Sequence, residues 1–346
     1  MLDDRAALAA ADPHGAREVL AAFPAQCRTA VDIETGALPP MKRPRVVVVA
    51  GMGGSAAAAD LVAACAADRV EVPIVVHRGY GLPSVAWDGA LVVAVSYSGN
   101  TAEVLSAVET AQVRRLPLAI VTAGGALGAL AKQRNVPCAL VPDGIMPRMA
   151  LGSLFFPLAR LLRALDLDVV SSAEIEEALT VVDALAAELG PERPSADNEA
   201  KRLAATIGAR WPAVYGGPVT GPVAYRWKTD FEENAKAFAL AGALPEMNHN
   251  TIEAWRTSRA RDLQLILLRD EHEAPEIQRR FEVLRQLVGA SAGGVSECQA
   301  RGQGVLARLL SLTYLGQWTS VYLAVLRGVD PWTIPTLDAM KRLLGS

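Results

Sequence analysis

Several common signals are missing from this sequence of 346 residues, and each absence narrows the possible functions. The formal net charge is only −3 and the sequence pI is about 5.9, so no electrostatic feature favours binding to nucleic acid. The first fifteen residues are acidic and lack the basic and apolar regions of a secretory signal peptide. There is also no low-complexity tail, coiled coil or short repeat.

The sequence contains few cysteines, and their spacing does not indicate a metal site. The four cysteines are scattered along the chain, at Cys27, Cys65, Cys138 and Cys298. This spacing matches no metal site and predicts reduced, mostly buried thiols in a cytoplasmic protein. The one long apolar stretch, residues 309–326, is interrupted by Gln317 and by several hydroxyl side chains. We therefore expect a buried core helix there and no membrane span.

The chain is long enough for two domains, and 51% of its residues are hydrophobic. After Pro44, short apolar runs alternate with helical segments. The expected strands are 46–50, 72–77, 91–96, 118–122 and 138–141, with helices near 55–67, 101–113 and 126–134. This alternation predicts a doubly wound α/β lobe, with parallel strands, right-handed crossovers and helices on both faces. Ligands in such sheets bind beyond the carboxyl ends of the strands.

A hydroxyl-rich turn, residues 96–101 (SYSGNT), lies at that edge between an apolar strand and an amphipathic helix. In a strand–turn–helix unit, backbone N–H groups and the positive end of the helix dipole point at an anion. The hydroxyls of Ser96, Ser98 and Thr101 add donors without adding charge, which favours a phosphate monoester. The same residue types are also the usual helix N-caps, so an ordinary capped helix remains an alternative.

A glycine turn, residues 51–55 (GMGGS), follows the first strand and precedes an alanine-rich helix. Its glycines, among them Gly54, allow the backbone to approach a ligand closely, and Ser55 adds a hydroxyl. The turn lacks the Lys-Ser/Thr of a P-loop, and it also lacks the last glycine and the acidic residue of the dinucleotide fingerprint. We expect it to share the anion site with the hydroxyl turn.

One cation is expected at the same edge. Arg148 follows Pro147 in a Pro- and Gly-containing loop, ahead of a long apolar helix over 150–165. It is placed to meet a sugar oxyanion, although an exposed loop arginine is the simpler alternative. At the start of the chain, residues 1–40 predict one or two helices outside the first lobe, closed by Pro39 and Pro40.

A second, shorter α/β lobe is expected after two helices over 171–209, which are broken at Gly190-Pro191 and at Pro194. We place the boundary near Pro194, giving an N-terminal lobe over 1–193 and a C-terminal lobe with a closing helix over 194–346. The expected strands are 213–215, about 243–246, 263–268 and 293–296. A turn at 215–221 weakly repeats the glycine turn, which suggests two related lobes.

Two polar segments of the second lobe contain candidate catalytic groups. In the helix over 226–236, six of eleven residues are ionisable. An exposed amphipathic helix would have the same composition. Further on, His249 stands between Asn248 and Asn250 in a polar turn. Asparagine neighbours can fix the tautomer and orientation of an imidazole.

Taken together, these segments resemble a known family. The glycine and hydroxyl turns resemble the sugar isomerase (SIS) domain. Pro147-Arg148, the helix motif Glu232-Glu233-Asn234-Ala235-Lys236 and the turn Pro245-Glu246-Met247-Asn248-His249-Asn250 resemble motifs of the bifunctional phosphoglucose/phosphomannose isomerases. The resemblance spans about residues 40–345. It implies two flavodoxin-like SIS lobes and a cofactor-free aldose–ketose isomerase that interconverts fructose 6-phosphate with glucose or mannose 6-phosphate.

The resemblance also assigns roles. It makes Glu233 the base that moves a proton between C2 and C1 through a cis-enediolate, and His249 the ring-opening group, assisted by Lys341 on the last helix. Arg148 stabilises the enediolate. The phosphate is held by residues of the two turns: Gly54, Ser55, Ser96, Ser98 and Thr101. Where the family motif has asparagine before the base, this chain has Glu232, whose charge either raises the pKa of the base or faces solvent.

The family further implies a homodimer with shared active sites, because its members supply the histidine from the neighbouring subunit. The sequence has no His/Glu zinc constellation, which argues against the unrelated metal-dependent phosphomannose isomerases. Two alternatives remain. One is a phosphosugar sensor without activity, although no basic helix-turn-helix is evident. The other is an isomerase of another sugar phosphate.

Overall fold

The computed structural model describes residues 1–38 and 41–344, and the chain forms two compact units. We call Ala22–Ser172 with Pro335–Ser346 the N-terminal lobe, and Met1–Ala21 with Ala173–Ile334 the C-terminal lobe. The boundary therefore lies at residues 172–173, not near Pro194. The first twenty-one residues, expected outside the first lobe, group with the second. Pro39 and Pro40 lie outside the described residues.

Specific contacts explain this division. In helix α8 (Ser172–Leu189), the carboxylate of Glu177 accepts hydrogen bonds from the backbone N–H groups of Gln303 and Gly304. The start of the chain forms α1 (Arg5–Ala11) and α2 (Ala16–Ala21), and the hydroxyl of Tyr314 donates to the carbonyl of Leu20 at 2.7 Å. Helix α8 and the N-terminal segment are thus bonded to the C-terminal lobe.

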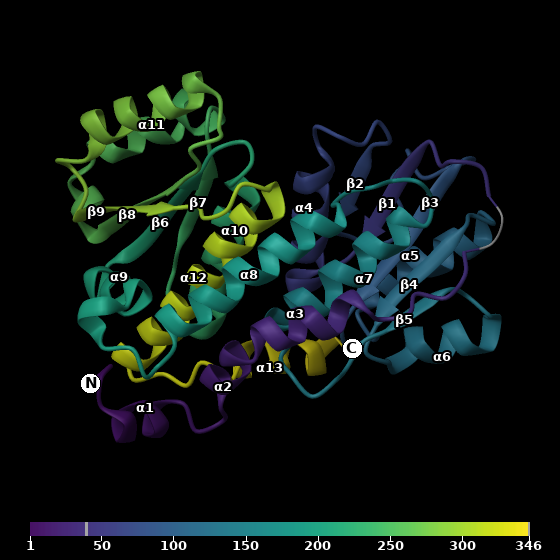
Figure 1. The fold of residues 1–346 in the computed structure, drawn as a ribbon, viewed down its shortest axis with the longest axis horizontal. Helices are drawn as coiled ribbons and strands as arrows, with labels where there is room; N and C mark the ends of the chain where they lie inside the picture. Colours follow the sequence, from purple (N-terminus) through teal and green to yellow (C-terminus); the bar gives the residue numbers. More distant parts are fainter. Residues whose placement is uncertain (39–40, 345–346) are drawn as a thin grey trace. The chain divides into compact units, whose positions relative to one another are not determined.

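The N-terminal lobe has a five-stranded, all-parallel sheet in the order β2-β1-β3-β4-β5 (Figure 1). The strands are β1 (Val46–Ala50), β2 (Ile74–His77), β3 (Ala90–Ser96), β4 (Leu118–Thr122) and β5 (Cys138–Leu140). This is the doubly wound, flavodoxin-like order that the sequence predicted. Since β1 and β3 are neighbours, the turns that follow them meet at one edge of the sheet.

Helices flank this sheet and bury its valine-rich strands. Helices α5 (Ala102–Val113) and α6 (Gly125–Arg134) share a core cluster with β3 and β4. Helices α4 (Gly53–Ala66) and α3 (Phe23–Val31) both pack on α7 (Leu151–Arg163), which follows a short 3-10 turn, η1 (Pro147–Met149). The last helix, α13 (Pro335–Leu344), has no buried residue along its described length.

The C-terminal lobe has a four-stranded parallel sheet in the order β7-β6-β8-β9. Its strands are β6 (Trp211–Gly216), β7 (Leu240–Ala243), β8 (Leu263–Arg269) and β9 (Gly294–Gln299). The expected strand over 243–246 was wrong in its position. Pro245 has no N–H to donate to a ladder, and the chain turns there into the 3-10 helix η3 (Glu246–His249).

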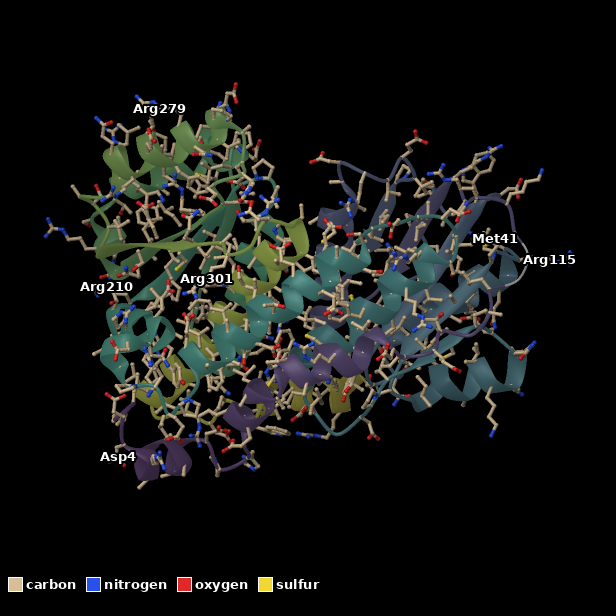
Figure 2. The ribbon with its side chains drawn as sticks, in the orientation of Figure 1. Asp4, Met41, Arg115, Arg210, Arg279 and Arg301 are labelled. Carbon is tan, nitrogen blue, oxygen red and sulfur yellow. The ribbon has the colours of Figure 1, made fainter. Side chains whose placement is uncertain are left out.

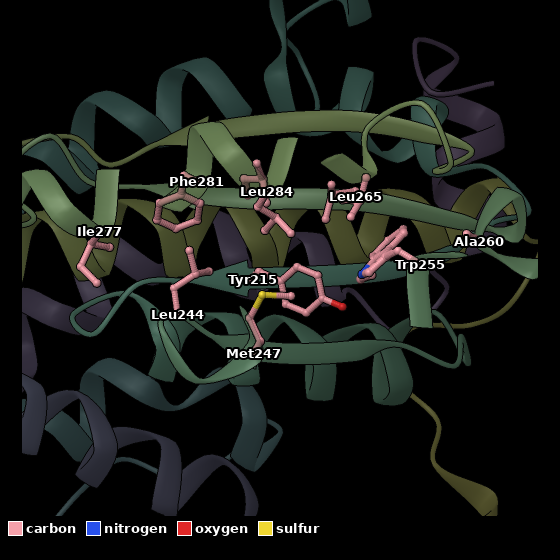
Figure 3. Packing of buried hydrophobic residues seen from close by; sticks show 12 residues of the cluster. Tyr215, Leu244, Met247, Trp255, Ala260, Leu265, Ile277, Phe281 and Leu284 are labelled. Carbon is pink, nitrogen blue, oxygen red and sulfur yellow. The ribbon is translucent and has the colours of Figure 1, made fainter. Parts of the chain in front are cut away.

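One side of this sheet is covered by α11 (Pro275–Val288), whose inner face packs Phe281 and Leu284 against Tyr215 (Figure 3). Arg279 projects from its outer face (Figure 2). The 3-10 helices η4 (Thr251–Arg256) and η5 (Ser258–Asp262) add Trp255 and Ala260 to the same cluster, and η2 (Ser195–Asp197) precedes α9. Helices α9 (Glu199–Ile207), α10 (Gly221–Asn234) and α12 (Val305–Leu326) pack together.

Helix α12 is long and apolar enough to cross a membrane by length and composition, but 94% of its most apolar window is buried inside the protein. The hydroxyl groups of Thr313 and Thr319 are satisfied within the helix. Thr313 donates to the carbonyl of Leu309 and Thr319 to that of Leu315, both at 2.7 Å. The helix is therefore a core element of the lobe, as the polar interruptions in its sequence indicated.

Candidate functional site

Two helix N-termini meet at the edge where β1 and β3 end. Helix α4 is preceded by Met52 and α5 by Thr101, and both residues have extended backbone. In neither helix does a capping side chain bond the first turn, in the part of the chain described here. The first N–H groups of a helix have no partner within it. Both helices thus present free donors and the positive end of a dipole to a ligand at this edge.

The glycine turn, the hydroxyl turn and the loop of Arg148 are in direct contact. The hydroxyl of Ser55 accepts a hydrogen bond from the backbone N–H of Tyr97 at 3.3 Å. A Cβ on Gly54 would lie 2.6 Å from the carbonyl oxygen of Pro147, so glycine is required for this approach. Arg148 is only 3% exposed. The simple alternative of an exposed loop arginine is therefore wrong.

The three aliphatic hydroxyls of the hydroxyl turn have different surroundings. The Oγ atom of Ser96 is buried 2.8 Å from Oγ1 of Thr101, and it accepts the N–H of Gly99 at 3.1 Å. Ser98 is exposed, and its hydroxyl accepts the N–H of Asn100 at 3.3 Å. Ser96 therefore braces the turn, and Ser98 remains accessible to a ligand. Thr101 bonds Ser96 and not its own helix, unlike an ordinary N-cap.

Two residues of this turn have structural roles that the sequence did not reveal. The hydroxyl of Tyr97 donates to the carbonyl of Pro142 at 3.1 Å and accepts the N–H of Ile145 at 3.3 Å. Burial raises the pKa of Tyr97, so it remains a neutral phenol that ties down the segment leading to Arg148. Asn100 accepts the N–H of Ala126, in the first turn of α6, at 2.9 Å. Of these two roles, only that of Asn100 could have been suspected from the sequence, because asparagine side chains often bond the first N–H groups of a helix.

In the C-terminal lobe, Glu233 lies in the last turn of α10 and is half-buried. Its neighbour Glu232 forms an ion pair with Lys228, one turn earlier, at 2.7 Å. Asn234 is buried and donates to the hydroxyl of Ser320 on α12 at 2.9 Å. The carboxylate that departs from the family motif is thus paired with a cation, and the residue after Glu233 anchors the helix end.

Lys236 completes this helix end. Its backbone is left-handed, with φ of 50°, and its ammonium group donates to the carbonyl of Asn234 at 3.3 Å and to the carbonyl of Asp330. A cation at the C-terminus of a helix offsets the negative end of the dipole. The residues around Glu233 in the motif therefore hold the end of α10 in a fixed conformation.

His249 is exposed in η3, and its asparagine neighbours bond elsewhere. Asn248 donates to the sulfur of Met247 at 3.2 Å, and Asn250 donates to the carboxylate of Glu246 at 2.8 Å. The expectation that these asparagines orient the imidazole was wrong, because their amides stabilise the turn itself.

The candidate residues thus fall into two groups. Gly54, Ser55, the hydroxyl turn and Arg148 come together in the N-terminal lobe, whereas Glu233 and His249 belong to the C-terminal lobe. Lys341 is exposed on α13, which groups with the N-terminal lobe.

Comparison with known proteins shows which family this chain belongs to. Residues 196–344 match the model of the bacterial phospho-glucose isomerase C-terminal SIS domain. A bifunctional phosphoglucose/phosphomannose isomerase of Caldicellulosiruptor bescii is 34% identical over 301 residues, which cover 86% of this chain and 89% of the relative. The protein of the same name from Thermoplasma acidophilum is 32% identical, over 86% and 88% of the two chains. The chain belongs to the bifunctional phosphoglucose/phosphomannose isomerase family.

Solved structures with a similar fold also exist for this member of the bifunctional phosphoglucose/phosphomannose isomerase family. A glucose-6-phosphate isomerase-like protein from Thermus thermophilus superposes with a TM-score of 0.63, covering 97% of this chain and 99% of its own. Sequence identity is 22%, so this likeness concerns the fold alone. The matched family model includes the elements that contain Glu233, His249 and Lys341.

Proposed function

We propose that this chain interconverts fructose 6-phosphate with glucose 6-phosphate and mannose 6-phosphate through a cis-enediolate, without a metal or redox cofactor. The names of its relatives support this reaction. The observation that carries the proposal is the meeting of two uncapped helix N-termini, lined by hydroxyls, at one edge of a parallel sheet. Such an edge favours a phosphate group.

In this proposal the phosphate binds where α4 and α5 begin. Ser98 and Thr101 donate from one turn and Ser55 from the other, while Gly54 lets the backbone approach and Ser96 keeps the hydroxyl turn closed. None of these groups is charged, so binding relies on hydrogen bonds and on the helix dipoles. The phosphate does not react, so these residues contribute binding energy equally to the ground and transition states.

Glu233 is the proposed base. It removes the proton from C2 of the open-chain aldose and delivers it to C1, and a positioned carboxylate can do this in both directions. The fixed helix end around Asn234 and Lys236 supports its placement. His249, with Lys341, opens the sugar ring by moving a proton between the ring oxygen and the C1 hydroxyl. Arg148 supplies a fixed positive charge to the enediolate oxygen as its charge develops.

Both epimers follow from the same intermediate. The planar enediolate has lost the configuration at C2, so reprotonation on one face gives the glucose isomer and on the other face the mannose isomer. Rotation about C2–C3 would present either face to Glu233. A single base can therefore serve both substrates.

We also place this activity in the cytoplasm, in a homodimer whose active sites are shared between subunits. The exposure of His249 supports sharing, because a ring-opening group on the surface of one chain is accessible to the sugar bound by another. The exposed last helix with Lys341 is accessible in the same way.

A coupled assay of the purified protein, in the presence of a chelator, tests the proposed reaction. The substrates are fructose, glucose, mannose and glucosamine 6-phosphates, each measured against the same protein concentration. Turnover of the glucose and mannose compounds supports the proposal. Turnover of glucosamine 6-phosphate alone would reassign the substrate, and saturable binding without turnover would indicate a phosphosugar sensor.

A further inference from the structure

The segment that contains Arg148 is held on both sides by side-chain bonds to its backbone. Before Arg148, the hydroxyl of Tyr97 bonds two backbone groups of the loop between β5 and η1. After it, the side-chain amide of Gln26, in α3, donates to the carbonyl of Met149 at 3.0 Å. The arginine between these two anchors lies in η1 and is only 3% exposed.

The same amide also bonds the first turn of the helix that follows Arg148. The Oε1 atom of Gln26 accepts the backbone N–H of Ser153 at 3.3 Å. Ser153 is the third residue of α7, and the first N–H groups of a helix have no partner within that helix. The residue before α7 is Ala150, whose methyl side chain cannot accept a hydrogen bond. Gln26 thus supplies from α3 an acceptor that the start of α7 does not supply itself.

The approach of Gln26 to α7 depends on a glycine. Helix α3 packs directly on α7 (Figure 1). A Cβ on Gly152 would lie 3.1 Å from Oε1 of Gln26 and 2.6 Å from the sulfur of Cys27. Real Cβ atoms do not come this close to a neighbour, so the amide reaches the first turn of α7 only because residue 152 is glycine. The two bonds also require an amide, since one side chain must donate to a carbonyl and accept an N–H.

A fixed backbone matters for an arginine with the role proposed above. The charge on the enediolate oxygen develops during the reaction, and a cation stabilises it best when the cation is already in place. Several rotatable bonds separate the guanidinium of Arg148 from its backbone, so its charge is well placed only if that backbone is fixed. The turn η1 is a 3-10 helix of three residues, which is a weak element by itself. Bonds from other elements therefore have to hold it.

We propose that Gln26 is a positioning residue for Arg148. It fixes the backbone that carries the arginine by bonding Met149 on one side of α7's start and Ser153 on the other. Gln26 acts only through these neighbours and has no proposed contact with substrate. The catalytic part of the inference rests on the proposed function, in which Arg148 stabilises the enediolate. The structural part, that Gln26 holds the turn around Arg148, does not.

The test removes both bonds and keeps the bulk of the side chain. Gln26→Met retains an unbranched side chain of similar length. Since Arg148 is proposed to act in the transition state, we expect kcat to fall about tenfold and KM to stay within about twofold of the wild type. Amide hydrogen exchange at Ser153 should be faster, because its N–H loses its acceptor. The matched control is Arg160→Met, which removes another bond between α3 and α7, from Arg160 to the carbonyl of Val31 at 3.2 Å. It should keep the wild-type kcat.

A double-mutant cycle shows whether Gln26 acts through Arg148. Combined with Arg148→Ala, Gln26→Met should lower kcat by less than about twofold further, because no guanidinium remains to be placed. A further tenfold loss would overturn the proposal, and so would a wild-type kcat or unchanged exchange at Ser153 in Gln26→Met. Where Arg148→Ala has no measurable turnover, the comparison of Gln26→Met with Arg160→Met decides.

A second variant keeps the proposal testable if Gln26→Met does not fold. Gln26→Asn retains an amide, but the side chain is one methylene shorter and cannot reach both partners. It should show the same loss in kcat and the same faster exchange at Ser153, and wild-type values of both would reject the positioning role. If the wild-type protein turns over no sugar phosphate, the proposed function fails, and exchange at Ser153 still decides whether Gln26 holds the turn around Arg148.

Discussion

The carbonyl oxygen of Pro147 lies 2.6 Å from the place that a Cβ on Gly54 would occupy. Real Cβ atoms do not approach backbone oxygen this closely, so the first turn of α4 and the loop of Arg148 fit together only through a glycine. This contact joins the start of α4, which is proposed to bind the phosphate, to the backbone of the buried arginine. It explains why a residue without a side chain belongs to the candidate site.

Gly54→Ala should therefore disturb the site more than the fold. The added methyl group forces the backbone at Pro147 and Arg148 to move, at a cost of about 1–3 kcal/mol in unfolding free energy. A displacement of about 1 Å at a reacting group typically lowers turnover about 10²-fold. Gly128→Ala in α6 is the control, because its Cβ would meet only a methyl group of Thr122 at 3.9 Å. Gly128→Ala should keep full activity and gain a little stability, and equal turnover in the two variants would contradict the prediction.

Ser98→Ala combined with Thr101→Ala should raise KM far more than it lowers kcat. Both hydroxyls are proposed to hold the phosphate, which is bound alike in the ground and transition states. Ser96→Ala provides the contrast. Its buried hydroxyl braces the turn, so its loss should lower the unfolding free energy by about 1–2 kcal/mol. Steady-state kinetics and urea unfolding separate the two effects, and an unchanged KM in the double variant would show that the turn is only a helix start.

Glu233→Gln should retain substrate binding and lose about two to four orders of magnitude in turnover, because the amide cannot accept the C2 proton. Exchange of the substrate's C2 hydrogen with solvent should stop as well. Glu232→Gln is the matched control, since that carboxylate is paired with Lys228 on the neighbouring face of the helix. It should lose much less activity. A dead Glu232→Gln beside an active Glu233→Gln would reverse the assignment.

Shared active sites predict complementation between two inactive chains. His249→Ala and Glu233→Gln should each be inactive as pure dimers. After mixing and subunit exchange, heterodimers should regain activity, because one of their two sites contains both native groups. Sedimentation analysis with differently tagged chains measures how much heterodimer forms. Heterodimers that remain inactive would show that each site is built within one chain.

Glu273 should make stability depend on pH in a direction opposite to that of a salt-bridged carboxylate. Burial, and to a smaller extent the charge of Asp270, raise its pKa from 4.5 to about 7 in the folded protein, so the folded state binds this proton more tightly than the unfolded chain. The contribution of Glu273 to the free energy of unfolding is therefore fully present below about pH 4.5 and is lost as the pH rises through about 7. Two to three pKa units correspond to about 3 kcal/mol. Urea unfolding between pH 4.5 and 8 should therefore show a steeper loss of stability in the wild type than in Glu273→Gln, and parallel pH profiles would contradict the raised pKa.

Much of the fold could be predicted from sequence because strong local patterns specify it. The valine-rich run at 46–50 and the run at 91–96 are strands within one residue of their expected bounds. The predicted position of a strand was wrong where the sequence pattern was weak. Strand β7 is only four residues long (LAGA), and it ends before Pro245, earlier in the chain than expected. The lobe boundary failed for another reason, since Glu177 and Leu20 are assigned to a lobe by contacts with residues more than a hundred positions away.

The candidate site shows the same limit. The hydroxyl and glycine turns could be predicted because each is a short motif at the end of a strand. The burial of Arg148 and the bonds of Tyr97 could not, because they depend on how three separate loops pack. The burial of Glu273 against Gly217 could not be predicted either, because it depends on how the loops after β6 and β8 pack together.

The bond from Asn234 to Ser320 has a consequence for biosynthesis. Asn234 follows the proposed base, yet its partner on α12 is translated 86 residues later. A ribosome that has completed α10 has therefore not yet made the element that anchors its end. Nascent chains that stop before α12 contain Glu233 but not the bond that holds its helix end in place. Translation through Ser320 is thus required before this end of α10 can reach its native arrangement.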